Sequence, residues 1–331
     1  MKKEHTLGAP ASGHCIEIVM NNKALFILAV LVLIASLISP SFLTARNISN
    51  IFKQVAASTI MAMGYTLVLG SANMDLSVGF LLGMLGIIAA KLDTAGVSFV
   101  VVVLVVMVIG AGSSMCNAFF ISTFNLPPFV VTLAMGQVFK GICYVISNTS
   151  AISGLSSTFL AMGQGSIGPI PVPVLISVAV TLIMCVVVYR TAFGRNLLAV
   201  GANAEAARVS GLDVKRIRYI TYALMGICVA IAALVLTGRS ASAQPQAGQG
   251  MENDALSAVV IGGTPLGGGY CKPAGTFFGC LVIGLINNIL NLLSVDSNWQ
   301  FAAKGATIIF AIILDSQSEK ILERRRLKAI K

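Results

Sequence analysis

The chain has 331 residues, of which 56% are apolar and 10% are charged, with a mean hydropathy of +0.91. Soluble domains are roughly 45–50% apolar and about 25% charged, which argues against a soluble enzyme, a disordered chain and a nucleic-acid-binding module. The composition indicates an all-α polytopic membrane protein. Lys and Arg outnumber Asp and Glu by 22 to 12. They gather before the first apolar run, between Arg190 and Arg218, and after Asp315, which predicts that these segments are cytoplasmic.

Ten apolar runs with almost no charged residues are candidate spans. In chain order they are 24–39, 55–72, 78–90, 97–121, 129–147, 172–189, 219–236, 255–262, 277–293 and 301–314. Ten transmembrane helices would place both termini in the cytoplasm, in agreement with the basic segments. The eighth run is short, and we expect a broken or re-entrant segment there.

The expected division of the chain follows from these runs. Residues 1–23 form a cytoplasmic segment, 24–315 a transmembrane region with a cytoplasmic loop at 190–218, and 316–331 a basic cytoplasmic tail. Similar residues open the third and eighth runs, NMDLS at 73–77 and NDALS at 253–257. An odd number of spans per repeat turns the second copy upside down, as in many transporters. Two inverted five-helix repeats are therefore a hypothesis, with chance similarity as the alternative.

Asp75 is the acidic residue of the first of these motifs. A carboxylate is costly in lipid, so Asp75 should face the bundle interior or an aqueous path. Asn73 and Asp75 are therefore candidates for a translocation pathway or gate. The alternative is local, because Asp75 or Ser77 could cap the helix that follows. Asp254 or Ser257 could cap the eighth run in the same way.

The stretch 239–252 is too polar for lipid and too rich in glycine for a helix. Such backbone is tolerated at membrane depth only inside protein or against a wet cavity. Amide side chains donate and accept hydrogen bonds without fixing a charge. Gln244, Gln246, Gln249 and Asn253 are therefore further pathway or gate candidates. The alternative is an outer loop that packs against a dimer partner.

The loop 190–218 contains the signals of a short helix. Asn203 can cap its start, alanines sustain it, and Gly211 can end it. Its small-residue surface combines Ala204, Ala206 and Ala207 with the charges of Glu205 and Arg208. Such a surface suits insertion into a groove on another protein. The alternative is a solvated helix at the lipid headgroups.

Several long motifs follow one another along the chain. They are Asp75-Leu-Ser-Val-Gly79, Gly194-Arg195, Gly201-x-Asn-x-Glu205-Ala-Ala-Arg208-x-Ser-Gly211, Ser242-Ala-Gln244-Pro-x-Ala-Gly248-x-Gly250 and Ala258-Val-Val-Ile-Gly262-Gly-Thr264-x-Leu-x-Gly-Gly269. In this order they resemble the membrane permease of bacterial ABC importers for ribose, xylose, galactose and related sugars. The resemblance extends over roughly residues 45–315.

The resemblance implies a permease that moves a monosaccharide or related solute across the bacterial cytoplasmic (inner) membrane. The implied partners are a cytoplasmic ATP-binding subunit, a periplasmic or lipid-anchored solute-binding protein, and a second permease in a homodimer or heterodimer. Residues 203–211 would act as a coupling helix. The residues implied in coupling to the ATPase are Gly194, Arg195, Asn203, Glu205, Ala206, Ala207, Arg208 and Gly211.

The sequence contains no G-x-x-x-x-G-K-[ST] loop. We therefore expect no enzyme activity, metal or cofactor in this chain, and ATP and Mg²⁺ to be used by the partner ATPase. Both histidines, His5 and His14, precede the first run, which argues against an intramembrane hydrolase. The main alternative function is an ion-coupled secondary transporter of a small polar solute, with Asp75 as its ionisable residue.

Other polar residues in the runs have simpler expected uses. Lys140 and Lys304 are expected to snorkel toward the membrane surface. The asparagines at 287, 288 and 291 are expected to form hydrogen bonds between helices. Residues 145–154 and 269–273 depart from the family pattern, the second being bulkier and more basic than the glycine and serine run expected there.

Overall fold

A computed structural model describes residues 23–296 and seven single residues between Trp299 and Ile313. In this part of the chain, six helices are long and apolar enough to cross a membrane. They are α3 (Ala45–Gly70), α5 (Phe99–Phe124), α6 (Pro128–Ser147), α8 (Val172–Arg190), α11 (Val214–Ser240) and α13 (Pro273–Leu292). A polytopic helical membrane protein is therefore confirmed, and the number ten stays a prediction. The segment 1–22, the tail 316–331 and Lys304 lie outside the described residues, as does most of the tenth run.

Three shorter helices occupy the first, third and eighth predicted runs: α2 (Lys23–Ile38), α4 (Val78–Thr94) and α12 (Met251–Ile261). The eighth run is short, as expected, at 11 residues. Three further helices connect the long ones: α7 (Ser157–Gln164), α9 (Ala192–Ala202) and α10 (Ala204–Val209). The predicted boundaries differ most at α3, which begins at Ala45 rather than at residue 55 because Thr44 caps it by accepting a hydrogen bond from the Asn47 N–H.

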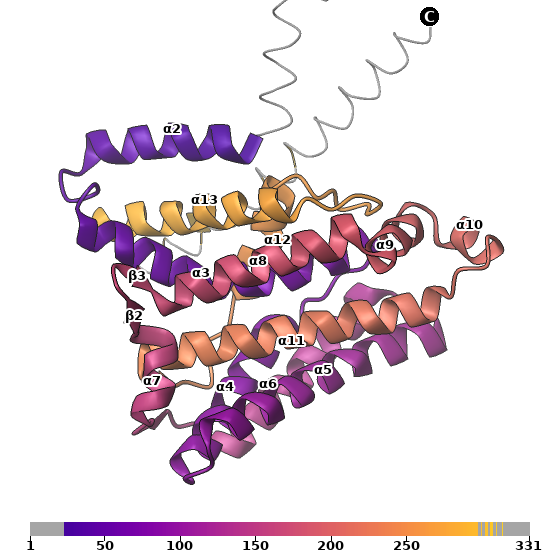
Figure 1. Ribbon diagram of the computed structural model, residues 1–331, viewed down its shortest axis with the longest axis horizontal. Coiled ribbons are helices and arrows are strands. Elements are labelled where there is room, and N and C mark those ends of the chain that lie inside the picture. Colours follow the sequence, from indigo (N-terminus) through magenta and orange to yellow (C-terminus); the bar gives the residue numbers. More distant parts are fainter. Residues whose placement is uncertain are drawn as a thin grey trace, which may run out of the picture.

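The long helices lie side by side, with α10 at one end of the molecule and α7 at the other (Figure 1). Near α7 are two short antiparallel strand pairs. The strand β1 (Ile152–Ser153) pairs with β4 (Ser242–Ala243), with Ile152 opposite Ala243, and β2 (Ser166–Ile167) pairs with β3 (Ile170–Pro171). Asp93 at the end of α4 accepts hydrogen bonds from the Ser156 N–H and hydroxyl, both at 2.7 Å. This carboxylate fixes the start of α7 against the bundle.

The core is formed around α3 and α11. In an apolar stretch of 18 residues within each helix, 78% of the residues are buried in α3 and 67% in α11, against 22% in α5 and 28% in α6. The outer faces of α5 and α6 are therefore the more exposed ones, and they present apolar residues such as Val108 and Val145, as helices in contact with lipid do. The helix α2 packs against α13 at the opposite side of the bundle (Figure 1).

Two non-helical loops, 71–77 and 241–250, each connect a long central helix to a short one. The carbonyl of Pro245 accepts a hydrogen bond from the Cys143 thiol of α6 at 3.7 Å. A Cβ atom at Gly79 of α4 would overlap the Glu252 carboxylate and the Gly248 carbonyl. The first turns of α4 and α12 therefore touch, and glycine permits this approach. Whether the two halves superpose as an inverted repeat stays a hypothesis.

Candidate functional site

The helix predicted between Asn203 and Gly211 is confirmed as α10. Asn203 Oδ1 accepts a hydrogen bond from the Ala206 N–H at 2.9 Å, which satisfies a donor at the helix start. Gly211 follows the last turn with φ of 86°, a conformation that glycine adopts without strain. The capping signals in the sequence therefore fixed both ends of α10, while its role in coupling stays a prediction.

The exposed surface of α10 differs from the predicted one. Arg208 Nη2 donates to Glu205 Oε1 at 2.6 Å, and both side chains are about 70% exposed. Ala206 is exposed, but Ala207 is buried against the protein, so its predicted place on the docking surface is wrong. Val209, which the sequence interpretation missed, is 80% exposed. Helix α10 therefore presents the Glu205–Arg208 ion pair and the exposed Val209.

Close backbone packing joins α9 to the core. A Cβ atom at Gly201 would overlap the carbonyl oxygen of Gly70, the last residue of α3, and would lie 2.7 Å from the Gly269 nitrogen. Gly269 in turn donates its N–H to the same Gly70 oxygen at 2.9 Å. The helix α9 is thereby held directly against the point where α3 ends and the loop 71–77 begins.

The start of α9 carries the other two predicted coupling residues. Gly194 is buried, and a Cβ atom there would overlap the carbonyl oxygens of Val187 and Val188. Its N–H donates to the Thr191 hydroxyl at 3.1 Å. Arg195 is exposed. Gly194 therefore permits the sharp turn from α8 into α9, and only Arg195 is available to a partner.

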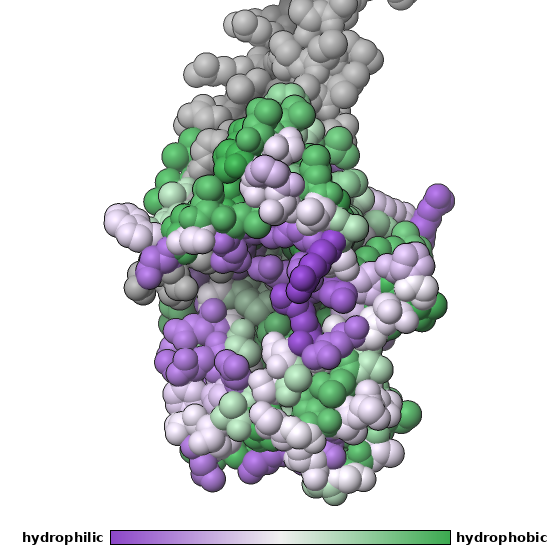
Figure 2. Space-filling model, turned by 90° about the vertical axis from the view of Figure 1, so that its left-hand side faces the viewer, coloured by the Kyte–Doolittle hydropathy of each residue, from purple (hydrophilic) through white to green (hydrophobic). Residues whose placement is uncertain are grey.

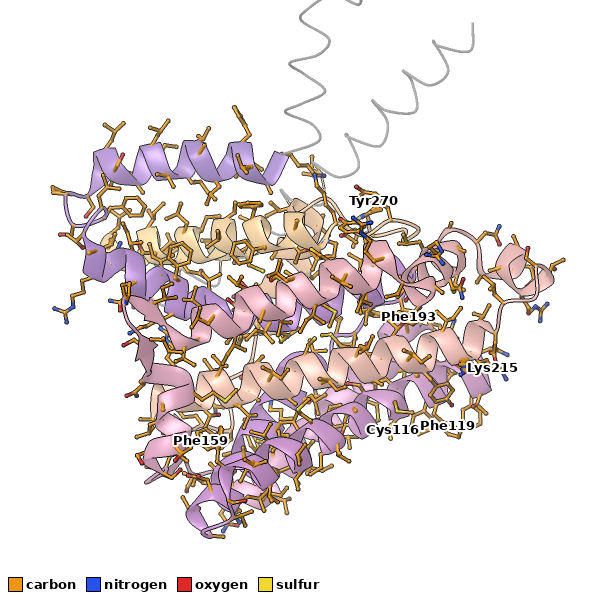
Figure 3. All side chains as sticks on the ribbon, in the orientation of Figure 1. Cys116, Phe119, Phe159, Phe193, Lys215 and Tyr270 are labelled. Atoms are coloured by element: carbon orange, nitrogen blue, oxygen red, sulfur yellow. The ribbon has the colours of Figure 1, made fainter. Side chains whose placement is uncertain are left out.

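The segment 269–273 lies at the same end of the molecule as α9 and α10, where Figure 3 labels Phe193, Lys215 and Tyr270. Tyr270 is 51% exposed, whereas Cys271 is fully buried and donates its thiol to the Thr66 carbonyl at 3.2 Å. Burial raises the pKa of the Cys271 thiol to about 12, which keeps it a neutral donor. Of the residues that depart from the family pattern, Cys271 is therefore packed in the core and Tyr270 is exposed at the surface.

Asp75 is fully buried in the bundle interior, one of the two locations expected for it. Its Oδ1 accepts hydrogen bonds from the Ser77 N–H at 2.9 Å and the Ser77 hydroxyl at 2.5 Å. Its Oδ2 accepts from Asn117 Nδ2 at 3.2 Å. Asn73 is also buried and donates to the Ser71 carbonyl at 2.8 Å. In this conformation neither Asn73 nor Asp75 reaches a surface.

The predicted helix caps at these motifs are wrong in detail. Ser77 precedes α4 without a side-chain capping bond, because its hydroxyl donates to Asp75 and its oxygen accepts from Asn117 Nδ2 at 2.9 Å. Asp254 and Ser257 lie inside α12, which begins at Met251. The Ser257 hydroxyl donates to the Asn253 carbonyl of its own helix at 2.9 Å, and the carboxylate of Glu252 accepts from the Gly250 N–H at 3.1 Å. Helix α12 therefore starts earlier than its apolar run suggests.

The side chains of Gln244, Gln246, Gln249 and Asn253 are all exposed. Gln246 and Gln249 lie next to Gly79, Phe80, Lys140 and Tyr144 around a crevice that is too narrow for a water molecule. The Lys140 ammonium nitrogen lies 5.8 Å from the ring centres of Phe80 and of Tyr144. Two aromatic rings therefore stabilise the positive charge of Lys140. This charge lies next to the amides of Gln246 and Gln249.

Comparisons with known proteins identify relatives along most of the chain. A family model described as "Branched-chain amino acid transport system / permease component" matches residues 47–312. The ribose import permease protein RbsC of Bacillus subtilis is 40% identical over 87% of this chain and 90% of its own. The D-allose transport system permease protein AlsC of Escherichia coli is 37% identical (88% and 90%), and the xylose transport system permease protein XylH of the same organism is 30% identical (96% and 98%).

Proposed function

The chain belongs to this family of transport-system permease components, and we propose that it is the permease subunit of an ATP-binding-cassette importer for a monosaccharide. The observation that carries the proposal is the similarity, over most of both chains, to permeases named for three different sugars. The separate ATPase, the solute-binding protein and a second permease subunit are part of the proposal. The location is the bacterial inner membrane.

The proposed orientation places α9 and α10 in the cytoplasm. The segment 190–218 that contains them is rich in Lys and Arg, and such segments stay on the cytoplasmic side. The opposite end, with α7 and the strand pairs, then faces the solute-binding protein (Figure 1). Both termini lie inside in this arrangement.

Coupling would run from α10 through α9 to the core. The ATPase binds α10, and its movement on nucleotide binding displaces α9 as a rigid unit. Gly201 of α9 transmits the displacement to Gly70 because their backbones are in direct contact. The loop 71–77 and α4 follow directly, so the displacement reaches the place where the first turns of α4 and α12 touch.

Charge reversal on α10 tests this coupling. In the double variant Glu205→Arg, Arg208→Glu, we expect stimulation of the ATPase to fall about tenfold or more. Like charges brought together at an interface cost several kcal/mol, and 1.4 kcal/mol corresponds to tenfold. The double variant keeps an ion pair within α10, but both charges then oppose the helix dipole, so the helix itself loses about 1–2 kcal/mol at most. Membrane insertion should be unchanged, and unaltered stimulation would count against α10 as the coupling helix.

Gln244→Ala tests the glutamine segment. If this exposed amide contacts the solute, we expect lower uptake with the complex still assembled, because one hydrogen bond contributes about 0.5–1.5 kcal/mol. Uptake should fall by about two- to tenfold. Asn50→Ala, which removes an exposed amide from α3 that forms no side-chain hydrogen bond among the described residues, is the matched control. Loss of assembly in Gln244→Ala would instead support packing against a dimer partner.

A further inference from the structure

A cavity of about 160 Å³ lies between α3, α11, α12 and α13. It is far larger than the 10–15 Å³, roughly, that a single water requires. Its polar lining consists of Gln54, Ser58, Arg239, Asp254 and Asn287. The rest of the wall is apolar and includes Leu236, Met251 and Ile283. A polar cavity between spanning helices needs an occupant, because lipid cannot satisfy such groups.

Four of these side chains have unused hydrogen-bonding capacity. In the part of the chain that the structure describes, Gln54, Ser58, Arg239 and Asn287 form no side-chain hydrogen bond, and Arg239 forms no ion pair. The Oδ1 atom of Asn287 is buried and has no partner. Of the polar atoms that line the cavity in the described residues, Asn287 Oδ1 alone is both buried and without a partner, which costs about 1–3 kcal/mol unless a ligand or water satisfies it.

The neighbouring asparagine shows that α13 can satisfy its amides where helix packing requires it. Asn288 and Asn47 of α3 exchange two hydrogen bonds, at 2.9 and 3.2 Å. The expected helix-to-helix use is thus confirmed for Asn288 and wrong for Asn287. Asn287 instead lines the cavity with its carbonyl oxygen free. This free carbonyl oxygen can accept a hydrogen bond from a ligand in the cavity.

The cavity lies toward the outer end of the bundle in the proposed orientation. Arg239 is next to last in α11, whose end lies on the side of α7 and far from α10 (Figure 1). Figure 2 views this end of the molecule and shows hydrophilic residues gathered around a hollow, with apolar residues above it. A solute released at this end would meet the cavity early in its passage.

We propose that this cavity is a binding station for the transported monosaccharide, an inference that rests on the proposed function. Amide and hydroxyl groups both donate and accept hydrogen bonds, and a guanidinium donates five, as the hydroxyls of a neutral sugar require. The apolar wall suits the C–H faces of the ring. Gln54, Ser58, Arg239 and Asn287 hold the sugar, and their arrangement sets which sugar passes.

The test uses the complete complex with its ATPase and binding protein in proteoliposomes. The variants Gln54→Leu and Asn287→Leu remove hydrogen-bonding groups at nearly constant volume. Uptake of labelled D-ribose, D-allose and D-xylose is measured together with ATP hydrolysis. Each variant should transport about two- to tenfold less sugar per ATP and change its preference among the three, with assembly unchanged.

A pair of smaller changes serves as control. Ser58→Ala should lower sugar transported per ATP, whereas Ser177→Ala should not, because the Ser177 hydroxyl donates to the Val174 carbonyl of its own helix. If the wild-type complex transports a sugar and the cavity variants keep its rate and preference, the binding station is overturned and the proposed function stands. If the wild-type complex transports none of these sugars, both fail.

A labelling experiment covers the case in which the leucine variants do not insert. Ser58→Cys changes little in size, and a membrane-permeant maleimide should label the new thiol, located by peptide mass. Saturating D-ribose should slow this labelling at least about tenfold if the sugar occupies the cavity. Labelling at residue 58 that is independent of each of the three sugars would identify a water-filled cavity only and overturn the inference.

Discussion

Replacement of Gly201 by alanine should reduce sugar uptake about tenfold or more, and replacement by valine should abolish it. The added Cβ atom meets two backbone groups, the Gly70 carbonyl and the Gly269 N–H, neither of which can turn aside as a flexible side chain would. The helix α9 must then separate from the end of α3, and the hydrogen bond between Gly269 and Gly70 is strained or lost. Overpacking of this kind costs about 1–3 kcal/mol and moves backbone. The link from α10 to the loop 71–77 is thereby interrupted.

Gly112→Ala in α5 is the matched control for this prediction. It is also a helical glycine, but a Cβ atom there would meet nothing within 4 Å, and alanine favours the helix by about 1 kcal/mol. Uptake and ATP hydrolysis in the reconstituted complex distinguish the two positions. In Gly201→Ala the ATPase should stay bound, but less sugar should be transported for each ATP hydrolysed. Equal uptake by the two alanine variants would mean that coupling does not pass through Gly201.

The sequence predicts local features of this molecule better than the direction in which a helix faces. Asn203 and Gly211 mark the ends of α10 because capping is a property of a few adjacent residues. Six residues are too few for a periodic pattern, so nothing local shows that Ala207 faces inward while Ala206 faces outward.

In the long helices, too, the sequence does not show which face points toward the core, but for a different reason. Lipid is as apolar as the protein core, so Val100, which is 68% exposed, and Val102, which is fully buried, are indistinguishable by residue type. The orientation of Asn287 toward a cavity and of Asn288 toward Asn47 depends on how α3 and α13 are rotated against each other. Such rotations arise from close approaches between distant segments, as at Gly201 and Gly70, and no short motif encodes them.

Replacement of Asp75 by leucine should remove most folded permease from the membrane. Asp75 accepts three hydrogen bonds, two from Ser77 and one from Asn117, in a fully buried position. Leucine leaves the two Ser77 donors without an acceptor, while the Asn117 amide keeps its bond to the Ser77 hydroxyl at 2.9 Å, so the cost is about 1–3 kcal/mol for each lost acceptor, or about 2–6 kcal/mol together. This is comparable with the whole stability of a typical protein, about 5–15 kcal/mol. Fluorescence-detected size-exclusion chromatography of a tagged chain would measure the loss.

Asp75→Asn should behave very differently and retain uptake within about threefold. The asparagine Oδ1 can accept from Ser77 as the aspartate does. Its new amide can donate to Asn117 Oδ1, which is buried and has no partner, once the Asn117 amide rotates and gives up its 2.9 Å hydrogen bond to the Ser77 hydroxyl. Asp213→Asn, an exposed change at the start of α11, controls for the loss of one negative charge. This comparison separates a structural carboxylate from an ionising one, because an ion-coupled transporter that used Asp75 would lose transport in Asp75→Asn while the protein stayed folded.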